Sequence, residues 1–159
     1  MSLCQIRCVL ISSEGPAHDS ALNKCCCNSR ETTGEPVSIK LTADRTEINA
    51  DGEDIVVLRI EALDKQGRLV PTASNFLSFK VSGEGQFIGV GNGDPNCQES
   101  DKEPKRSLFN GLAQVILQST KEPGEIHIEA VKEGWFGPEL TPAKLTITTK
   151  KVDLRPQVA

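Results

Sequence analysis

The sequence lacks two features on which many binding and membrane proteins depend: an excess of basic residues and a long apolar run. Its 159 residues hold 18 lysines and arginines against 22 aspartates and glutamates, a formal net charge of -4. Nucleic acids and anionic membrane surfaces are bound through basic patches, whereas basic residues here occur at most as pairs, such as Lys105 with Arg106. No apolar run approaches the roughly 20 residues that span a bilayer. We therefore expect no nucleic acid and no membrane as partners.

A secretory signal is also missing from the start of the sequence. Such a signal needs an apolar stretch of about 7 to 15 residues, and residues 1–12 contain only the short run Val9-Leu10-Ile11. If the protein is exported, we expect its signal to lie elsewhere.

The cysteines lack the partners that a zinc site requires. A tetrahedral site uses two pairs of ligands, each pair separated by two to four residues, but three of these cysteines are adjacent and His18 has no partner histidine. Five of the six cysteines fall in the first thirty residues: Cys4, Cys8, Cys25, Cys26 and Cys27. We predict that residues 1–32 form a poorly ordered, thiol-rich extension and bind no metal.

From residue 33 onward, short segments alternate apolar and polar residues with a period of two, the pattern of half-buried strands. Turns rich in glycine, proline and aspartate separate these segments, and no amphipathic helix of convincing length is present. We predict about seven strands, at 37–42, 55–63, 76–81, 86–91, 112–118, 125–131 and around 145–147. This spacing is typical of an all-β antiparallel sandwich, with a domain at 33–150 and a polar tail at 151–159.

Two features of antibody-type sandwiches are absent. No cysteine pair is placed to join the two sheets, and the sequence has no tyrosine with which to build a tyrosine corner. We therefore expect neither the inter-sheet disulfide nor the tyrosine corner of antibody domains.

The stretch Gly89-Val-Gly-Asn-Gly-Asp-Pro95 looks most like a functional motif. A dinucleotide-binding loop needs G-x-G-x-x-G at the start of a helix, and a P-loop ends in Gly-Lys-Ser/Thr. Here Asp94 stands where the third glycine should be, Pro95 follows, and no Gly-Lys pair occurs. We interpret the glycines as a tight corner after a strand, with Asn and Asp capping exposed backbone amides, and expect no cofactor.

Calcium is the closest alternative for this stretch, because four residues match the spacing of positions 1, 3, 5 and 12 of an EF-hand loop. Cys97 occupies position 6, where glycine makes the sharp turn, and no helices flank the loop. The four weak metal candidates are Asn92, Asp94, Asn96 and Glu103.

Candidates for catalysis are few. His127 lies on the polar face of its predicted strand, where a solvated histidine is expected, and no serine lies in a G-x-S-x-G elbow. We predict no catalytic residue. Trp135 and Phe136 lie between glycines and are the candidates for a glycan contact or a contact with another domain, the alternative being that one ring caps the core.

Three segments in this order resemble the invasin-type bacterial Ig-like domain. They span Ile39 to Asp54, which contains "ADGED", Glu61 to Pro95, which contains "GVGNGDP", and Phe109 to Ala130, which begins "FNGLA". They are most similar to the form found as a C-terminal accessory domain of bacterial family 2 glycoside hydrolases of the beta-galactosidase type. The family-marking loop comprises Gly89, Gly91, Asn92, Gly93, Asp94 and Pro95.

The resemblance implies a seven-stranded immunoglobulin-like sandwich that is not catalytic, because the catalytic glutamates of such hydrolases lie in a separate barrel domain. It also implies partners among the other domains of a parent hydrolase located in the periplasm or outside the cell. A carbohydrate-binding module and a surface adhesin repeat remain the alternatives. Residues 1–30 do not resemble the preceding domain of those hydrolases.

Overall fold

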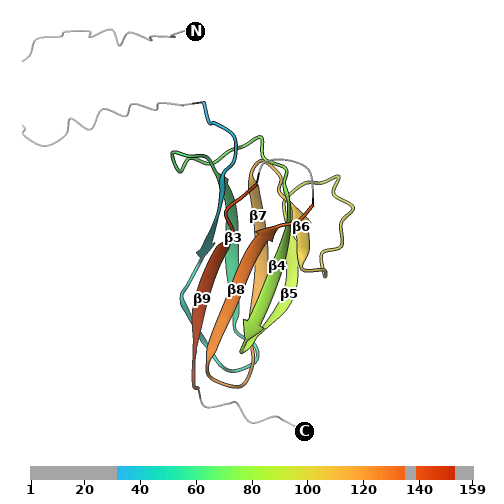
Figure 1. Cartoon of the computed structure of the whole chain (residues 1–159). Coiled ribbons are helices and arrows are strands. Elements are labelled where there is room, and N and C mark those ends of the chain that lie inside the picture. Colours follow the sequence, from blue (N-terminus) through green and yellow to red (C-terminus); the bar gives the residue numbers. More distant parts are fainter. Residues whose placement is uncertain (1–31, 135–138, 153–159) are drawn as a thin grey trace, which may run out of the picture. The chain divides into compact units, whose positions relative to one another are not determined.

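The computed structural model describes residues 32–134 and 139–152, which fold into two facing β-sheets (Figure 1). A four-stranded sheet has the order β1-β3-β7-β5, and a five-stranded sheet has the order β2-β9-β8-β4-β6. No helix long and apolar enough to cross a membrane occurs in this described part. The strands are β1 (Ser38–Ala43), β2 (Glu47–Asn49), β3 (Ile55–Leu63), β4 (Phe76–Gly83), β5 (Gly85–Gly91), β6 (Lys105–Ser107), β7 (Leu112–Ser119), β8 (Glu125–Lys132) and β9 (Ala143–Lys150).

The predicted immunoglobulin-like β-sandwich is confirmed, and its core follows from the period-two alternation. In β3, Val56, Leu58 and Ile60 are buried while Ile55 and Arg59 are exposed. β7 and β8 alternate in the same way, so both sheets direct one apolar face into a common interior. The largest fully buried side chains are Val56, Leu58, Ile60, Val70, Leu77, Val115, Leu117, Ile126, Ile128 and Ile147.

The described residues form two more strands than the seven predicted, and one pair of neighbouring strands is parallel. The extra strands are β2, within a segment predicted as turn, and β6. β2 pairs in parallel with β9, through Ile48 opposite Thr149. Each has only three residues, of which only the central one is buried, so neither produces a readable alternation. Both lie at the edges of the five-stranded sheet, where short strands limit unwanted pairing with other chains.

A buried carboxylate fixes the turn after β3 and the segment that leads into β1. Asp64 accepts hydrogen bonds from the backbone N–H groups of Gln66, Arg68 and Gly34 at 2.9, 2.9 and 3.1 Å and from the Arg68 guanidinium at 2.8 Å. Burial acts to raise the pKa of Asp64, but these hydrogen bonds outweigh it and hold that pKa well below its usual range. The ionised carboxylate is therefore the form that holds this turn.

Candidate functional site: the β5–β6 loop and the sheet face beside it

The family-marking loop begins inside a strand. Gly89 and Gly91 belong to β5 and lie opposite Ile116 and Gln114 of β7, on the outer side of the sheet, whereas Val90 points into the core. A β-bulge at Ile88 shifts the register just before them. The stretch is therefore a strand end followed by a turn, as the sequence indicated.

Crowding by neighbouring atoms does not explain the glycines at this corner. A Cβ atom added at Gly91 or Gly93 would meet nothing within 4 Å, and one added at Gly89 would approach only the carbonyl oxygen of Asp101, at 3.3 Å. Gly93 has a φ of 76°, the left-handed conformation that glycine adopts without strain. Turn geometry therefore requires Gly93, whereas Gly91 leaves open space above the sheet.

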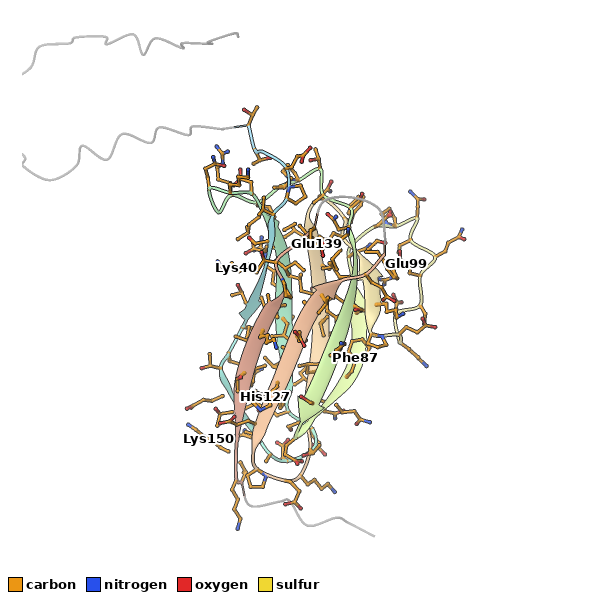
Figure 2. The ribbon with its side chains drawn as sticks, in the orientation of Figure 1. Lys40, Phe87, Glu99, His127, Glu139 and Lys150 are labelled. Atoms are coloured by element: carbon orange, nitrogen blue, oxygen red, sulfur yellow. The ribbon has the colours of Figure 1, made fainter. Side chains whose placement is uncertain are left out.

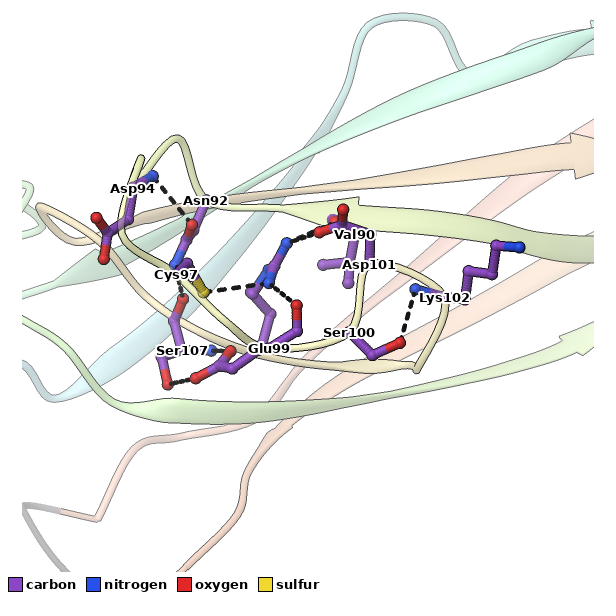
Figure 3. Close-up of polar contacts among 10 residues, drawn as sticks. Val90, Asn92, Asp94, Cys97, Glu99, Ser100, Asp101, Lys102 and Ser107 are labelled. Carbon is purple, nitrogen blue, oxygen red and sulfur yellow. Dashed lines mark hydrogen bonds and ion pairs between the residues drawn. The ribbon is translucent and has the colours of Figure 1, made fainter.

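Arg106 of β6 holds the loop that follows the motif. Its partners Val90, Glu99 and Asp101 are labelled in Figure 3. Its side chain is 4% exposed. Its Nη2 donates to the carbonyl oxygen of Val90 at 3.1 Å, and its Nη1 donates to the carbonyl oxygen of Glu99 at 3.0 Å and lies 3.2 Å from the Cys97 sulfur. Nη2 also pairs with the Asp101 carboxylate, which is largely exposed. One guanidinium thus joins the end of β5 to the middle of the loop.

A second group of contacts closes the loop on Ser107, the residue after Arg106. Glu99 accepts hydrogen bonds from the Ser107 backbone N–H at 2.8 Å and from the Ser107 hydroxyl. The Asn92 side chain donates to the Ser107 carbonyl oxygen at 2.9 Å and accepts from the Asp94 backbone N–H at 3.1 Å. These polar side chains satisfy several of the loop's own backbone groups, as ladder hydrogen bonds do in a strand.

Two of the four weak calcium candidates, Asn92 and Asp94, are used in the same local way. Asp94 accepts from the backbone N–H of Asn96 at 2.9 Å, which makes it a turn cap, and Glu103 is exposed. Among residues 32–134 and 139–152, no group of three or more His, Cys, Asp or Glu side chains is arranged to hold a metal ion.

Two hollows flank the motif. One, of about 630 Å³, lies on the outer face of the four-stranded sheet, and its lining includes Val57, Arg59, Gly91, Gly93 and Gln114. The other, of about 540 Å³, lies within the loop and is lined by Ser74, Asn92, Asp94, Cys97, Gln98, Glu99, Ser107, Leu108 and Phe109. The motif therefore contributes to both surfaces.

The remaining predicted residues lie away from this site or outside the described residues. His127 is on the outer face of β8, where its ring lies 3.0 Å from the Thr146 hydroxyl and 3.6 Å from the Glu125 carboxylate (Figure 2). Its exposed position matches the surface role expected from the sequence. Trp135 and Phe136 lie outside the described residues, as do the five N-terminal cysteines, so the predictions for them stay predictions.

Sequence reasoning missed the residues that build the loop, above all Arg106, Glu99 and Ser107. We considered Arg106 only as half of a basic pair. The sequence held no usable signal, because Arg106 is charged and its burial, like that of Leu108 two residues later, is known only from the structure.

Fold and site together define a β-sandwich domain with one long, internally braced loop. Residues 39–141 match the family described as glycoside hydrolase family 2 C-terminal domain 5. The match covers well over half of the sequence, and the chain belongs to this family.

The relatives are much longer proteins. Beta-galactosidase BoGH2A of Bacteroides ovatus is 41% identical over 103 residues, which make up 65% of this chain and 12% of that protein. A beta-glucuronidase of Formosa agariphila is 34% identical over 122 residues, 75% of this chain and 12% of that protein. The chain thus spans about one eighth of the length of these curated relatives.

Solved structures agree with this relationship. A family 2 glycosyl hydrolase of Bacteroides cellulosilyticus superposes with a TM-score of 0.71 at 34% identity, over 76% of this chain and 15% of that one. The D00-D0 domain of intimin superposes with a TM-score of 0.50 at 20% identity, a likeness that concerns the fold alone.

Proposed function

We propose that this chain is a non-catalytic accessory module of a glycoside hydrolase resembling beta-galactosidase, and that it works by packing against other domains of that enzyme. The observation that carries the proposal is the family match combined with length: the chain corresponds to a C-terminal domain that makes up 12% of a beta-galactosidase and 12% of a beta-glucuronidase.

The chemistry of the loop supports an accessory role. General acid and base catalysis needs titratable groups that are free to exchange protons with a substrate in a pocket. The half-buried carboxylates Asp94 and Glu99, which line the loop hollow, instead accept hydrogen bonds from the loop itself. These groups maintain a conformation, which is what a rigid docking element requires.

Two measurements test the proposal. The purified 159-residue chain should not turn over chromogenic galactosides or glucuronides above the blank. BoGH2A in which residues 37–150 of this chain replace the matched segment should be active and should unfold at a higher temperature than BoGH2A with that segment deleted. Turnover by the isolated chain, or equal melting temperatures of the replaced and deleted enzymes, would contradict the proposal.

Carbohydrate binding is the second candidate, favoured by the loop hollow. Phe109 is 37% exposed and lies in a hollow with Ser74, Gln98 and Asp94, and an aromatic face beside polar groups suits a sugar ring. Titration with galactosides and polysaccharides, followed by Trp135 fluorescence and by calorimetry, tests this candidate. Loss of the calorimetric response in Phe109→Ala or Trp135→Ala would support it, and no response at millimolar ligand would exclude these sugars.

A further inference from the structure

The outer faces of the two sheets differ in chemistry. On the five-stranded sheet the outward positions are mostly polar, with Phe76 and Val131 as apolar exceptions, and several form ion pairs, such as Lys144 with Glu129 at 3.2 Å. Water solvates such a face well. Its outward residues include Ser78, Lys80, Ser82, Glu125, His127, Glu129, Lys144, Thr146 and Thr148.

The outer face of the four-stranded sheet has an apolar centre instead. Val57 of β3 lies opposite Ile116 of β7, and Ile116 lies opposite Gly89 of β5, so three adjacent strands present no polar side chain at this level. Ile55 and the bulged Ile88 extend the patch and are 40% and 44% exposed. We refer to Ile55, Val57, Ile88, Gly89 and Ile116 as the apolar face.

The surroundings of the apolar face resemble the anatomy of a protein interface, in which a polar rim encloses an apolar centre. Arg59 and Glu61 form an ion pair at 2.9 Å on one side, and Gln86 lies opposite Gln118 on the other. The 630 Å³ hollow opens beside the centre, at Gly91 and Gly93, where no side chain occupies the space. A protruding side chain of a partner fits this hollow.

We propose that the apolar face is the surface by which this module docks onto the preceding part of its own hydrolase. This inference rests on the proposed function and adds the face that is used. The family is described as a C-terminal domain, so in its members the rest of the enzyme precedes it. The preceding chain enters the module through β1, an edge strand of the same sheet that carries the apolar face. A covalent link at that edge raises the effective concentration of the two surfaces.

The available area agrees with a contact inside one chain. The whole outer face of the four-stranded sheet, the apolar face and its polar rim together, offers roughly 400–450 Å², since its four strands are spaced about 4.8 Å apart and are some seven residues long at about 3.3 Å per residue. Counted on both partners, this is roughly 900 Å², within the 600–1,500 Å² that is common between domains of one chain. A stable dimer of two separate copies buries about 1,600 Å², so a second copy is the poorer fit.

The test uses the BoGH2A chimera that carries residues 37–150 of this chain, with the isolated 159-residue chain as reference. Hydroxyl-radical footprinting measures the modification rate of single side chains. Because interface centres are desolvated, we expect the rates of Ile88 and Ile116 to fall at least about threefold in the chimera, while the rate of His127 stays unchanged. Ile116→Glu should restore the rate at Ile88, whereas the matched change Thr146→Glu on the other sheet should not.

Each alternative outcome has a distinct meaning. Protection of His127 without protection of Ile116 would overturn the assigned face while leaving the accessory role intact. Protection of neither would overturn both the face and docking as the function. Concentration-dependent protection of Ile116 in the isolated chain would assign the face to a second copy. Because Ile116→Glu could disturb folding, Ile116→Ser and an unfolding curve of each variant are measured alongside.

Discussion

Replacing Arg106 with alanine should destabilise the whole domain, because this side chain joins β5 to the loop. The change removes two hydrogen bonds from a charged donor to the carbonyl oxygens of Val90 and Glu99, each worth about 1.5–3 kcal/mol. The pair with Asp101 adds little, because that carboxylate is 77% exposed and screened by water. Removing Arg106 also relieves its buried Nε, which has no hydrogen-bond partner, a gain of about 1–2 kcal/mol. The expected net loss is about 2–4 kcal/mol.

Urea unfolding of the 159-residue chain measures this loss. With a slope of about 2 kcal/mol per molar urea, the midpoint should fall by about 1–2 M. Lys102→Ala, an exposed change in the same loop, should stay within about 0.5 kcal/mol of the unchanged protein. Arg106→Lys should recover only part of the stability, because an ammonium group cannot donate in the fork geometry of a guanidinium. Equal midpoints for Arg106→Ala and Lys102→Ala would refute the reasoning.

Three further predictions concern single residues of the sandwich. Asp64→Asn should lower the free energy of unfolding at neutral pH. The pKa of Asp64 in the folded protein lies below its unfolded value of 3.8. The ionised carboxylate therefore stabilises the fold above about pH 4, and this stabilisation is lost on acidification. The difference in unfolding midpoint should therefore shrink between pH 7 and pH 3, and a constant difference would contradict this. Gly111→Ala should lower the free energy of unfolding by more than about 2 kcal/mol, because φ is 75° and the added Cβ would lie 2.2 Å from the Val70 carbonyl oxygen. Gly67→Ala is the control: Gly67 has a similar φ but open space around it, so this change should cost only about 1 kcal/mol. Leu117→Ala should cost about 2–5 kcal/mol because the side chain is fully buried, against less than about 0.5 kcal/mol for the exposed Ile88→Ala; similar urea midpoints for these two would contradict the assigned core.

The strands that could be predicted were those whose burial alternates over many residues. β3 and β8 each bury every second residue along most of their length, and this period is visible in sequence. β2 and β6 bury one residue each, and their pairing depends on β9 and β4, which are distant in sequence. Such strands exist because of tertiary contacts, which no local pattern encodes.

For the candidate site, too, only part of the structure could be predicted from the sequence. The position of the motif at a strand end and the need for a glycine turn followed from local chemistry, since Gly93 adopts a positive φ and Asn92 and Asp94 cap the turn. The hydrogen bonds of Arg106 could not be predicted from local chemistry, because its partners Val90 and Glu99 are 16 and 7 residues away along the chain. A guanidinium that reaches across a loop leaves no fixed spacing in the sequence.

The loop and the apolar face are connected through one strand. The Val90 side chain points inward, and its carbonyl oxygen accepts a hydrogen bond from Arg106. The neighbouring positions, Gly89 and Gly91, face outward and carry no side chain, so the sheet surface is open there. The path of β5, and with it the shape of the hollow, therefore depends on the loop on the other side of that strand. If the apolar face docks as proposed, Arg106→Ala should weaken protection of Ile116 in the chimera even under conditions where the variant stays folded. Unchanged protection would show that β5 keeps its path without the loop.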